Sequence, residues 1–178
     1  MSKVLVIDTS TSRTSVAIIE ADSVLFSGFR DGTTAHGPSL PALVQEALAI
    51  SAVDEVVVGM GPGPFTGLRV GIAFAQSFAL AREIPVRGVC SLDAIAAHID
   101  ENDFIITVDA RRKEVYWARY TDGVRVGEPA VNFPVDVSGA PIHADLFPDM
   151  QALVKLGGNI TEPIYLRRPD AVATADRP

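Results

Sequence analysis

Residues 59–71 read Gly-Met-Gly-Pro-Gly-Pro-Phe-Thr-Gly-Leu-Arg-Val-Gly. An apolar run at residues 56–58 precedes this stretch and indicates a buried strand, and residues 68–82 after it have the pattern of a helix. Glycine allows close backbone approach, whereas Pro62 and Pro64 fix φ and remove N–H donors. The stretch therefore predicts a rigid strand-to-helix turn with Thr66 as the N-cap of the helix. The residues assigned to the turn are Gly61, Pro62, Gly63, Phe65 and Thr66.

The spacing of this turn does not match the common phosphate-binding loops. A Walker loop consists of a glycine, four further residues and then Gly-Lys-Ser/Thr. Here Gly67 is followed by Leu68, and the stretch contains no lysine. The dinucleotide fingerprint also fails, because Pro64 or Thr66 stands where its third glycine should be. Two prolines further reduce the succession of N–H groups that a phosphate needs. A packing turn is therefore favoured over a nucleotide site.

The predicted helix after the turn carries a stripe of small residues. Glycine or alanine recurs every four residues, and that spacing places them on one face. Most of the remaining circumference is apolar as well, which predicts burial nearly all round. The second helix against this stripe could come from the same chain or from a partner, and the few elements of a small domain favour a partner. The predicted partner interface comprises Gly67, Leu68, Gly71, Ile72, Ala75 and Ala79.

Residues 59–71 resemble the signature G-x-G-P-G-S-F-T-G-[LV]-R-[VI]-G of the TsaB (YeaZ) family, with Pro64 in place of the usual serine. The family was first labelled glycoprotease-like. The resemblance implies a non-catalytic subunit in the synthesis of N6-threonylcarbamoyladenosine (t6A) at adenosine 37 of tRNA. It also implies a TsaD-type catalytic subunit that this chain docks and activates, and a TsaE-type ATPase. The free protein is expected to form a homodimer and to meet tRNA only through the complex.

Composition and charge restrict the domain number, the cellular compartment and the partners expected for the protein. The chain has 178 residues, of which 48% are hydrophobic, enough for a core in one or two small domains. A single cysteine, Cys90, excludes an intramolecular disulfide and favours the cytoplasm. No signal peptide or membrane-spanning run is evident, so no membrane contact is expected. The formal net charge of −7 makes the isolated chain a poor binder of nucleic acid.

The opening pattern of the sequence recurs about one hundred residues later, which indicates an internal duplication. Residues 3–8 form an apolar strand ending in Asp8, and residues 104–109 form another ending in Asp109; each is followed by a polar turn and a return strand. This layout predicts an α/β protein with a duplicated actin-like (ASKHA, RNase H-like) fold of mixed sheets and packed helices, and the family resemblance implies the same fold. In catalytic relatives two such aspartates hold phosphate and metal. Here Asp8 and Asp109 are assigned to a vestigial nucleotide cleft, or each only ties its own turn.

The duplication suggests two subdomains of unequal size. Residues 1–102 are expected to form an N-terminal actin-like subdomain with the glycine-rich turn and the docking helices. Residues 103–170 are expected to form a shortened C-terminal subdomain that ends near Pro163-Ile-Tyr-Leu-Arg167, which resembles the closing Pro-x-Tyr-Leu-Arg of the family. Residues 171–178 are expected to form a frayed tail.

Residues for catalysis or metal binding are scarce. His36, His98 and His143 lie far apart without ligand spacing, so no metal site is predicted, and no Gly-x-Ser-x-Gly elbow is present. His36 falls where the family also tends to have a histidine, and a contact role is assigned to it. Residues 109–116 resemble the family pattern Asp-Ala-Arg-x-x-Glu-Val-Tyr, in which Arg111 and Glu114 either form an ion-paired hairpin or face a partner or nucleotide.

Two classes of function remain open from the sequence. The first is a non-catalytic interaction module that binds no cofactor of its own, with a nucleotide at a subunit interface left open. The second is an enzyme of the same superfold, an ATP-dependent phosphotransferase or hydrolase that uses Asp8 and Asp109; a glycoprotease-like metallopeptidase is a further alternative. Fold alone does not choose between them, and ATP turnover by the isolated protein discriminates.

Overall fold

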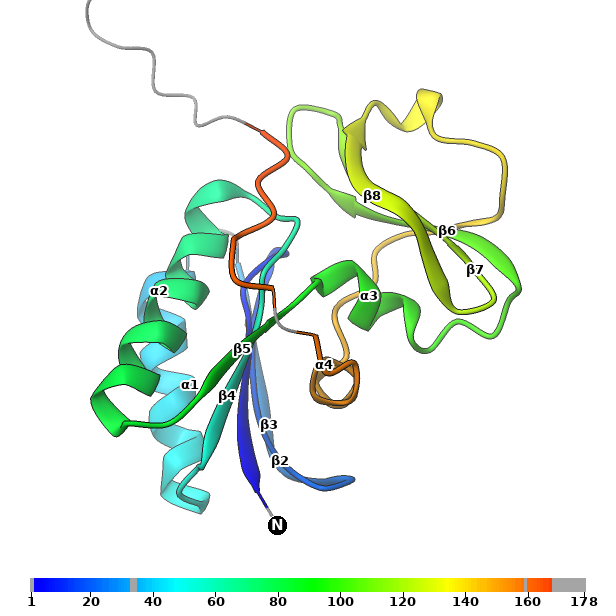
Figure 1. The fold of residues 1–178 in the computed structure, drawn as a ribbon. Coiled ribbons are helices and arrows are strands. Elements are labelled where there is room, and N and C mark those ends of the chain that lie inside the picture. Colours follow the sequence, from blue (N-terminus) through cyan, green and yellow to red (C-terminus); the bar gives the residue numbers. More distant parts are fainter. Residues whose placement is uncertain (1, 33–34, 159, 168–178) are drawn as a thin grey trace, which may run out of the picture.

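The computed structural model describes residues 2–32, 35–158 and 160–167, which form two lobes around two mixed sheets (Figure 1). The first sheet has the strand order β3-β2-β1-β4-β5, with β1 and β4 parallel and the β1–β2–β3 meander antiparallel. Its strands are β1 (Lys3–Asp8), β2 (Arg13–Glu20), β3 (Ser23–Asp31), β4 (Glu55–Gly59) and β5 (Val86–Val89). The second sheet has the order β8-β7-β6-β9 and contains β6 (Asp103–Asp109), β7 (Val115–Thr121), β8 (Val124–Asn132) and β9 (Ile142–His143).

The helices lie on both faces of the first sheet. Helices α1 (His36–Ile50) and α2 (Phe65–Arg82) cover one face, and α4 (Met150–Lys155) covers the other (Figure 1). Helix α3 (Ser91–Ala96) packs mainly on the second sheet and so joins the two lobes. A single 3₁₀ turn, η1 (Pro134–Asp136), lies in the connection from β8 to β9.

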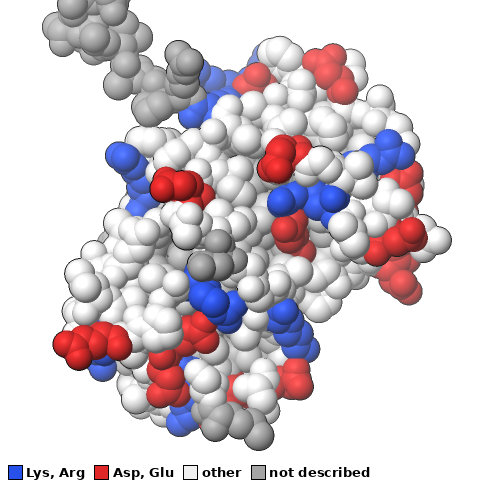
Figure 2. All heavy atoms as spheres, in the orientation of Figure 1, with Lys and Arg blue, Asp and Glu red and all other residues white. Residues whose placement is uncertain are grey.

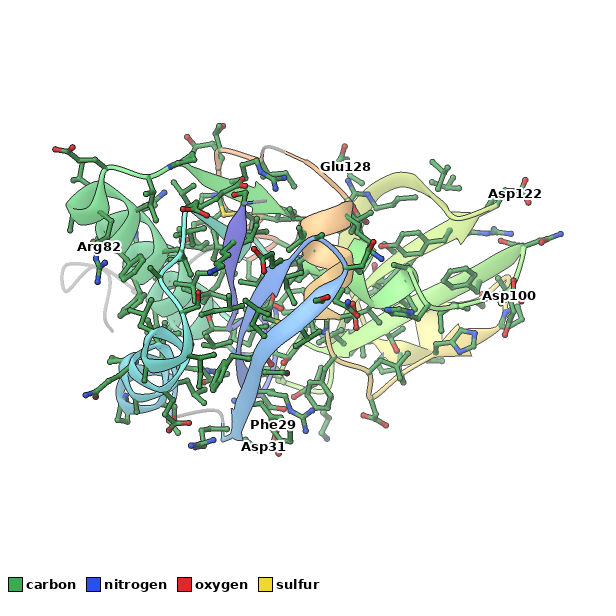
Figure 3. The ribbon with its side chains drawn as sticks, turned by 90° about the horizontal axis from the view of Figure 1, so that it is seen from below. Phe29, Asp31, Arg82, Asp100, Asp122 and Glu128 are labelled. Atoms are coloured by element: carbon green, nitrogen blue, oxygen red, sulfur yellow. The ribbon has the colours of Figure 1, made fainter. Side chains whose placement is uncertain are left out.

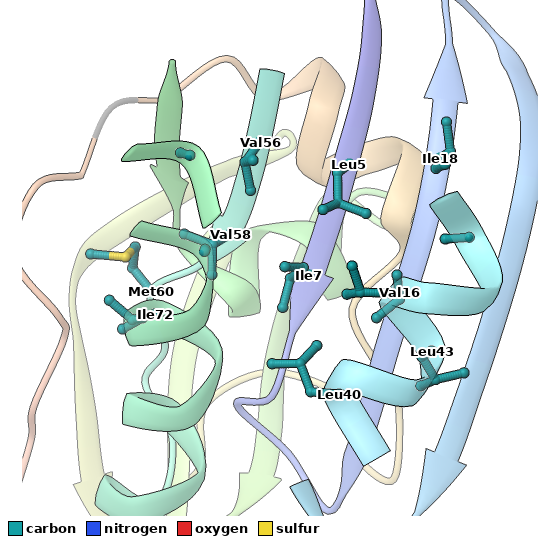
Figure 4. Packing of buried hydrophobic residues seen from close by; sticks show 14 of the residues in the cluster. Leu5, Ile7, Val16, Ile18, Leu40, Leu43, Val56, Val58, Met60 and Ile72 are labelled. Atoms are coloured by element: carbon teal, nitrogen blue, oxygen red, sulfur yellow. The ribbon is translucent and has the colours of Figure 1, made fainter. Parts of the chain in front are cut away.

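The central strands are apolar on both faces because both faces are covered. In β1, Leu5 and Ile7 point toward α1 and α2, whereas Val4 and Val6 belong to the cluster under α4. Figure 4 shows the first of these clusters, in which the strand side chains meet the inner sides of both helices. This packing accounts for the continuous apolar runs from which the strands were predicted.

The predicted duplicated α/β fold is confirmed. Each lobe begins with an antiparallel hairpin whose first strand ends in an aspartate, Asp8 opposite Ser15 and Asp109 opposite Val115. The second lobe is the smaller one in the part of the chain that the structure describes, and it has no long helices like α1 and α2.

Two details of the prediction need correction. Helix α2 begins at Phe65 rather than at residue 68, and Pro64 is its N-cap, so Thr66 lies inside the first turn and caps nothing. The first intrahelical bond from Leu68 N–H reaches the Pro64 carbonyl at 2.9 Å, which draws the turn residues into the helix. The Gly-rich turn is therefore shorter than expected.

The C-terminal segment does not stay with the second lobe. Helix α4 packs on β1, β2 and β4 of the first sheet. The N–H groups of Ile160 and Ile164 then donate to the carbonyls of Gly88 and Met60 at 2.8 and 2.9 Å. The predicted second subdomain of residues 103–170 thus supplies α4 and residues 160–164 to the first lobe. The tail predicted at residues 171–178 lies outside the described residues.

Candidate functional site

The Asp8 carboxylate is fully engaged inside the first lobe. Its side chain is 1% exposed. Oδ1 accepts from Ser10 N–H at 2.9 Å and from Ser10 Oγ at 2.7 Å, and Oδ2 accepts from Ser91 Oγ at 2.7 Å. Burial raises the pKa of Asp8, and the hydrogen bonds from Ser91 and Ser10 only partly offset that effect. Asp8 therefore ties the turn after β1 to the start of α3.

The motif turn fills the space beside the Asp8 turn. A Cβ placed on Gly63 would lie 2.4 Å from the carbonyl oxygen of Ser10, so the two backbones touch. Thr9 Oγ1 donates to the Gly67 carbonyl at 2.8 Å and accepts from Gly71 N–H at 3.2 Å. No room is left between these two turns for a phosphate group.

The small-residue stripe of α2 faces its own lobe, which corrects the predicted interface. A Cβ on Gly71 would lie 2.3 Å from Thr9 Oγ1, because the helix must approach the turn after β1 closely. The stripe is therefore used for packing within the chain and is not open to a partner. The buried residues of α2 are Gly67, Leu68, Gly71, Ile72, Ala75 and Ala79.

The opposite side of α2 is exposed and carries apolar groups. We define the outer face of α2 as Ala73, Gln76, Ser77 and Leu80, all exposed, with Leu80 at 81%. Beside it lie the half-buried rings of Phe74 and Phe78, stacked with centroids 6.1 Å apart. Sequence reasoning recognised that the helix is apolar nearly all round, but it chose the wrong side for the surface.

His36 is buried at the start of α1 and contacts both β2 and α2. Its Nδ1 lies 2.8 Å from Thr14 Oγ1, and its ring would be 3.0 Å from a Cβ on Gly67. Burial lowers the pKa of His36, and the charge of Arg111 from the second lobe lowers it further. This histidine positions α1 and α2, and the described residues around it hold it neutral.

The second aspartate lies in a different environment. Asp109 is exposed, and its Oδ1 accepts from the backbone N–H of Arg111 at 2.9 Å. Arg111, Arg112 and Lys113 follow with φ of 64°, 55° and 64°, a run of left-handed residues that we call the basic turn. Of the two alternatives for Arg111 and Glu114, the structure does not have the ion pair between them, because Glu114 pairs with Arg167.

Arg167 connects the closing motif to the basic turn, and sequence reasoning missed this role. Its Nη1 donates to the Ala110 carbonyl at 2.8 Å, and its Nη2 to the Arg111 carbonyl at 3.4 Å. Two residues earlier, Tyr165 meets the start of α2: its ring centroid is 5.0 Å from that of Phe65, and its hydroxyl accepts from Arg69 Nε at 3.3 Å. The Arg69 guanidinium lies over the Phe65 ring at 4.4 Å. We call Phe65, Arg69 and Tyr165 the aromatic cluster.

A small cavity between the lobes is lined by Asp109 but not by Asp8. Its volume is about 110 Å³, below the roughly 300 Å³ at which ligand pockets usually begin. Asp109 and Arg111 line it together with Thr11 and Pro64, but Asp8 does not. No group of three or more His, Cys, Asp or Glu among the described residues could hold a metal ion. In that part of the chain, no helix is long and apolar enough to cross a membrane.

The environment of His36 predicts a pH dependence of stability. Its folded pKa lies below its unfolded value of about 6.5, so the unfolded chain binds the extra proton more readily. The contribution is complete above that value and is lost as the pH falls toward the folded pKa. We expect the free energy of unfolding, measured in urea, to fall between about pH 7 and pH 5, and to fall less steeply in His36→Gln.

A matched variant tests the contact across the lobes. Arg111→Ala removes a positive charge near the imidazole, so the pKa of His36 in an NMR titration should rise. His98 and His143 serve as internal controls, because their Nε2 atoms lie 3.2 Å from Asp149 and 3.0 Å from Glu101. An unchanged His36 pKa would contradict the proximity of the basic turn to the first lobe.

Comparison with known proteins places the chain beside tRNA-modification proteins. A family model described as TsaD, tRNA N6-adenosine threonylcarbamoyltransferase, matches residues 33–170. An uncharacterized protein of Mycobacterium tuberculosis is 42% identical over 200 residues, covering 96% of this chain and 94% of that protein. The tRNA threonylcarbamoyladenosine biosynthesis protein TsaB of Escherichia coli is 35% identical over 127 residues. That alignment covers 66% of this chain and 54% of TsaB, so it spans about half of the latter's length.

Two solved structures have the same arrangement of lobes. YeaZ from Pseudomonas aeruginosa matches with a TM-score of 0.74 and 28% identity, covering 88% of this chain and 90% of that one. A crystal structure described as an uncharacterized protein with similarity to peptidase YEAZ from Pseudomonas aeruginosa matches with a TM-score of 0.79 and 28% identity. It covers 94% of this chain and 100% of the other, so both lobes are included.

Proposed function

Because the chain belongs to the TsaB/YeaZ family of t6A biosynthesis proteins, we propose that it is a non-catalytic subunit that docks and activates a TsaD-type catalytic subunit. That partner would transfer threonylcarbamoyl to N6 of adenosine 37 in tRNA. The proposal rests on the hydrogen bonds of the Asp8 carboxylate and on the packing of the turn that follows it. Ser10 and Ser91 engage both carboxylate oxygens, and the motif turn packs directly against the backbone of Ser10.

The second aspartate supports the same conclusion. Asp109 is tied to the backbone of the basic turn, and the cavity that it lines is about 110 Å³. Catalysis of phosphoryl transfer needs charges that are positioned around the phosphate and its metal ion. A chain in which Asp8 is buried and fully bonded while Asp109 lies exposed at its own turn is better suited to organise a partner than to hydrolyse ATP. A TsaE-type ATPase would supply that activity in the complex.

We assign the docking surface to the outer face of α2. Leu80 is 81% exposed and lies beside the half-buried rings of Phe74 and Phe78, and large exposed apolar patches are uncommon on monomers. The small-residue stripe supports this surface from within by holding the helix close to the sheet. In the absence of the catalytic subunit, the same outer face would form the homodimer.

Ala73→Arg tests this surface. The variant places a charge on the outer face, at its N-terminal end, without touching the core, because Ala73 is exposed. A charge buried without a partner is costly, so we expect the affinity for the TsaD-type subunit of the same cell to fall about 100-fold. Ser138→Arg, which adds the same charge at an exposed position of the second lobe, is the control. Undiminished binding by a folded Ala73→Arg variant would exclude this face.

A further inference from the structure

Cations without an acidic partner gather where the two lobes meet. Elsewhere in the described chain most are paired: Arg13, Arg30, Arg87, Arg119, Arg125 and Lys155 each contact an aspartate or glutamate. Arg69, Arg111 and Lys113 form no ion pair with a described residue, and Arg69 and Arg111 belong to adjoining sites. Figure 2 shows Lys and Arg atoms at the upper edge of the molecule.

The backbone of the basic turn is held in a fixed shape by groups that leave the side chains of Arg111 and Lys113 exposed. Left-handed backbone costs a non-glycine residue roughly 1–2 kcal/mol, so three in succession need support. Asp109 Oδ1 accepts from the first residue of the turn, and the N–H of Ala110 donates to the Glu114 carbonyl at 2.9 Å. Arg167 donates to carbonyls below the turn and pairs with Glu114. Arg111 and Lys113 thus remain exposed on a rigid loop.

The aromatic cluster continues this surface. Tyr165 contacts Arg69 of the cluster, and Arg167, two residues later, donates to the Ala110 carbonyl at the start of the basic turn. The Cα atoms of Tyr165 and Arg167 are at most about 7 Å apart. Tyr165 is 37% exposed, and Arg69 is exposed beside it. The opposite end of the second lobe is acidic, with Asp100 and Asp122 at its far tip (Figure 3).

We propose that the basic turn and the aromatic cluster bind a single-stranded segment of RNA, which in the proposed function is a loop of the tRNA substrate held by the assembled complex. Exposed cations suit the phosphate backbone, and an exposed aromatic ring beside them suits an unstacked base. An acidic protein segment would use the cations but would not need the exposed ring. Because the rest of the chain is acidic, we expect most of the RNA-binding surface to belong to the partner, and this contact to add to it.

The salt dependence of tRNA binding tests the proposal. The complex with the TsaD-type subunit is titrated with tRNA between about 50 and 200 mM salt. Losing two phosphate contacts in Arg111→Ala/Lys113→Ala should weaken binding about tenfold or more and reduce the salt slope by about 1.4, at roughly 0.7 per contact for a single strand. The control Lys3→Ala/Lys155→Ala also removes two cations, one from β1 and one from α4, where Lys155 pairs with Asp22. The control should leave the slope unchanged.

A second variant separates stacking from charge. Tyr165→Leu keeps an apolar side chain but removes the ring, so we expect about fivefold weaker binding or more with an unchanged salt slope. If neither variant weakens RNA binding more than the control does, the proposal is overturned.

A further measurement keeps this inference distinct from the proposed function. The isolated chain is titrated at low salt with an RNA hairpin that carries the anticodon loop, and no partner is needed. We expect binding that is weak in the wild type and abolished in Arg111→Ala/Lys113→Ala. If wild-type complex fails to assemble while this binding is present, the proposed function fails and the RNA site stands. If the turn variant loses the catalytic subunit but not the RNA hairpin, the turn contacts protein and the RNA proposal is wrong.

Discussion

Gly63→Ala is expected to destabilise the protein by about 3 kcal/mol, a large value for a single added methyl group. The new Cβ would lie 2.4 Å from the carbonyl oxygen of Ser10 and 2.9 Å from its Cα. Both atoms belong to the backbone of the turn after β1, which Asp8 and Ser91 hold in place, so no flexible side chain can move aside. Relief of the clash requires the motif turn and α2 to shift together.

The free energy of unfolding in urea, extrapolated to water, measures this effect. Gly37→Ala is the matched control, because a Cβ at Gly37 would meet nothing within 4 Å and the residue lies in the first turn of α1. Alanine is the better helix former, so the control should be neutral or slightly stabilising. If Gly63→Ala were as stable as wild type, the two turns could not be in contact as described.

The strands and the two-lobed plan were accessible from the sequence because they depend on local patterns. Continuous apolar runs identify β1, β4 and β6, which are buried on both faces. The repeated run that ends in an aspartate identifies the duplication. Asp122-Gly123 identifies the hairpin between β7 and β8, where both residues have positive φ. Each of these signals lies within a few residues of the element that it predicts.

The direction of the small-residue stripe was not accessible in the same way. Glycine and alanine at four-residue spacing allow close approach of any backbone, and the sequence does not say which one. The structure resolves the question through Thr9, whose hydroxyl bonds to both Gly67 and Gly71 of the stripe. That contact joins residues about sixty positions apart, and periodicity within the helix carries no information about it.

The ion pair between Arg167 and Glu114 was missed for a related reason. The two residues belong to separate motifs, and the nearer Arg111 offered an apparent partner for the same carboxylate. The left-handed backbone of the basic turn directs Arg111 elsewhere, while residues 160–164 bring the closing motif along the first lobe. Pairing therefore depended on the path of the chain after α4, for which the sequence has no periodic signal.

The two aspartates show how one local pattern acquires two environments. Both end the first strand of a hairpin, and both accept a hydrogen bond from the backbone N–H two residues later. Ser91 at the start of α3 covers Asp8 in the first lobe, whereas Asp109 stays exposed beside the cavity. The position of α3 depends on β5 and on the connection between the lobes, so the sequence around each aspartate could not distinguish them.

This difference predicts unequal consequences of removing the two carboxylates. Asp8→Ala leaves Ser10 N–H, Ser10 Oγ and Ser91 Oγ without their acceptor in a site that is 1% exposed. Each buried donor left without a partner costs about 1–3 kcal/mol, and the hydroxyls can turn to limit the loss, so we expect a total of about 4 kcal/mol. Asp109→Ala removes one hydrogen bond at an exposed turn and should cost about 1 kcal/mol.

Urea unfolding of both variants at neutral pH provides the comparison, and Asp8→Asn extends it to function. The amide keeps the size of the side chain and one acceptor oxygen, so this variant should remain folded and lose about 2 kcal/mol. If Asp8 only anchors the turn, Asp8→Asn should still bind and activate the TsaD-type subunit, and wild type should show no ATP hydrolysis for the variant to lose. A wild-type ATPase activity that Asp8→Asn abolishes without unfolding would make the carboxylate a catalytic group, and the protein would then be an enzyme of its superfold rather than a docking subunit.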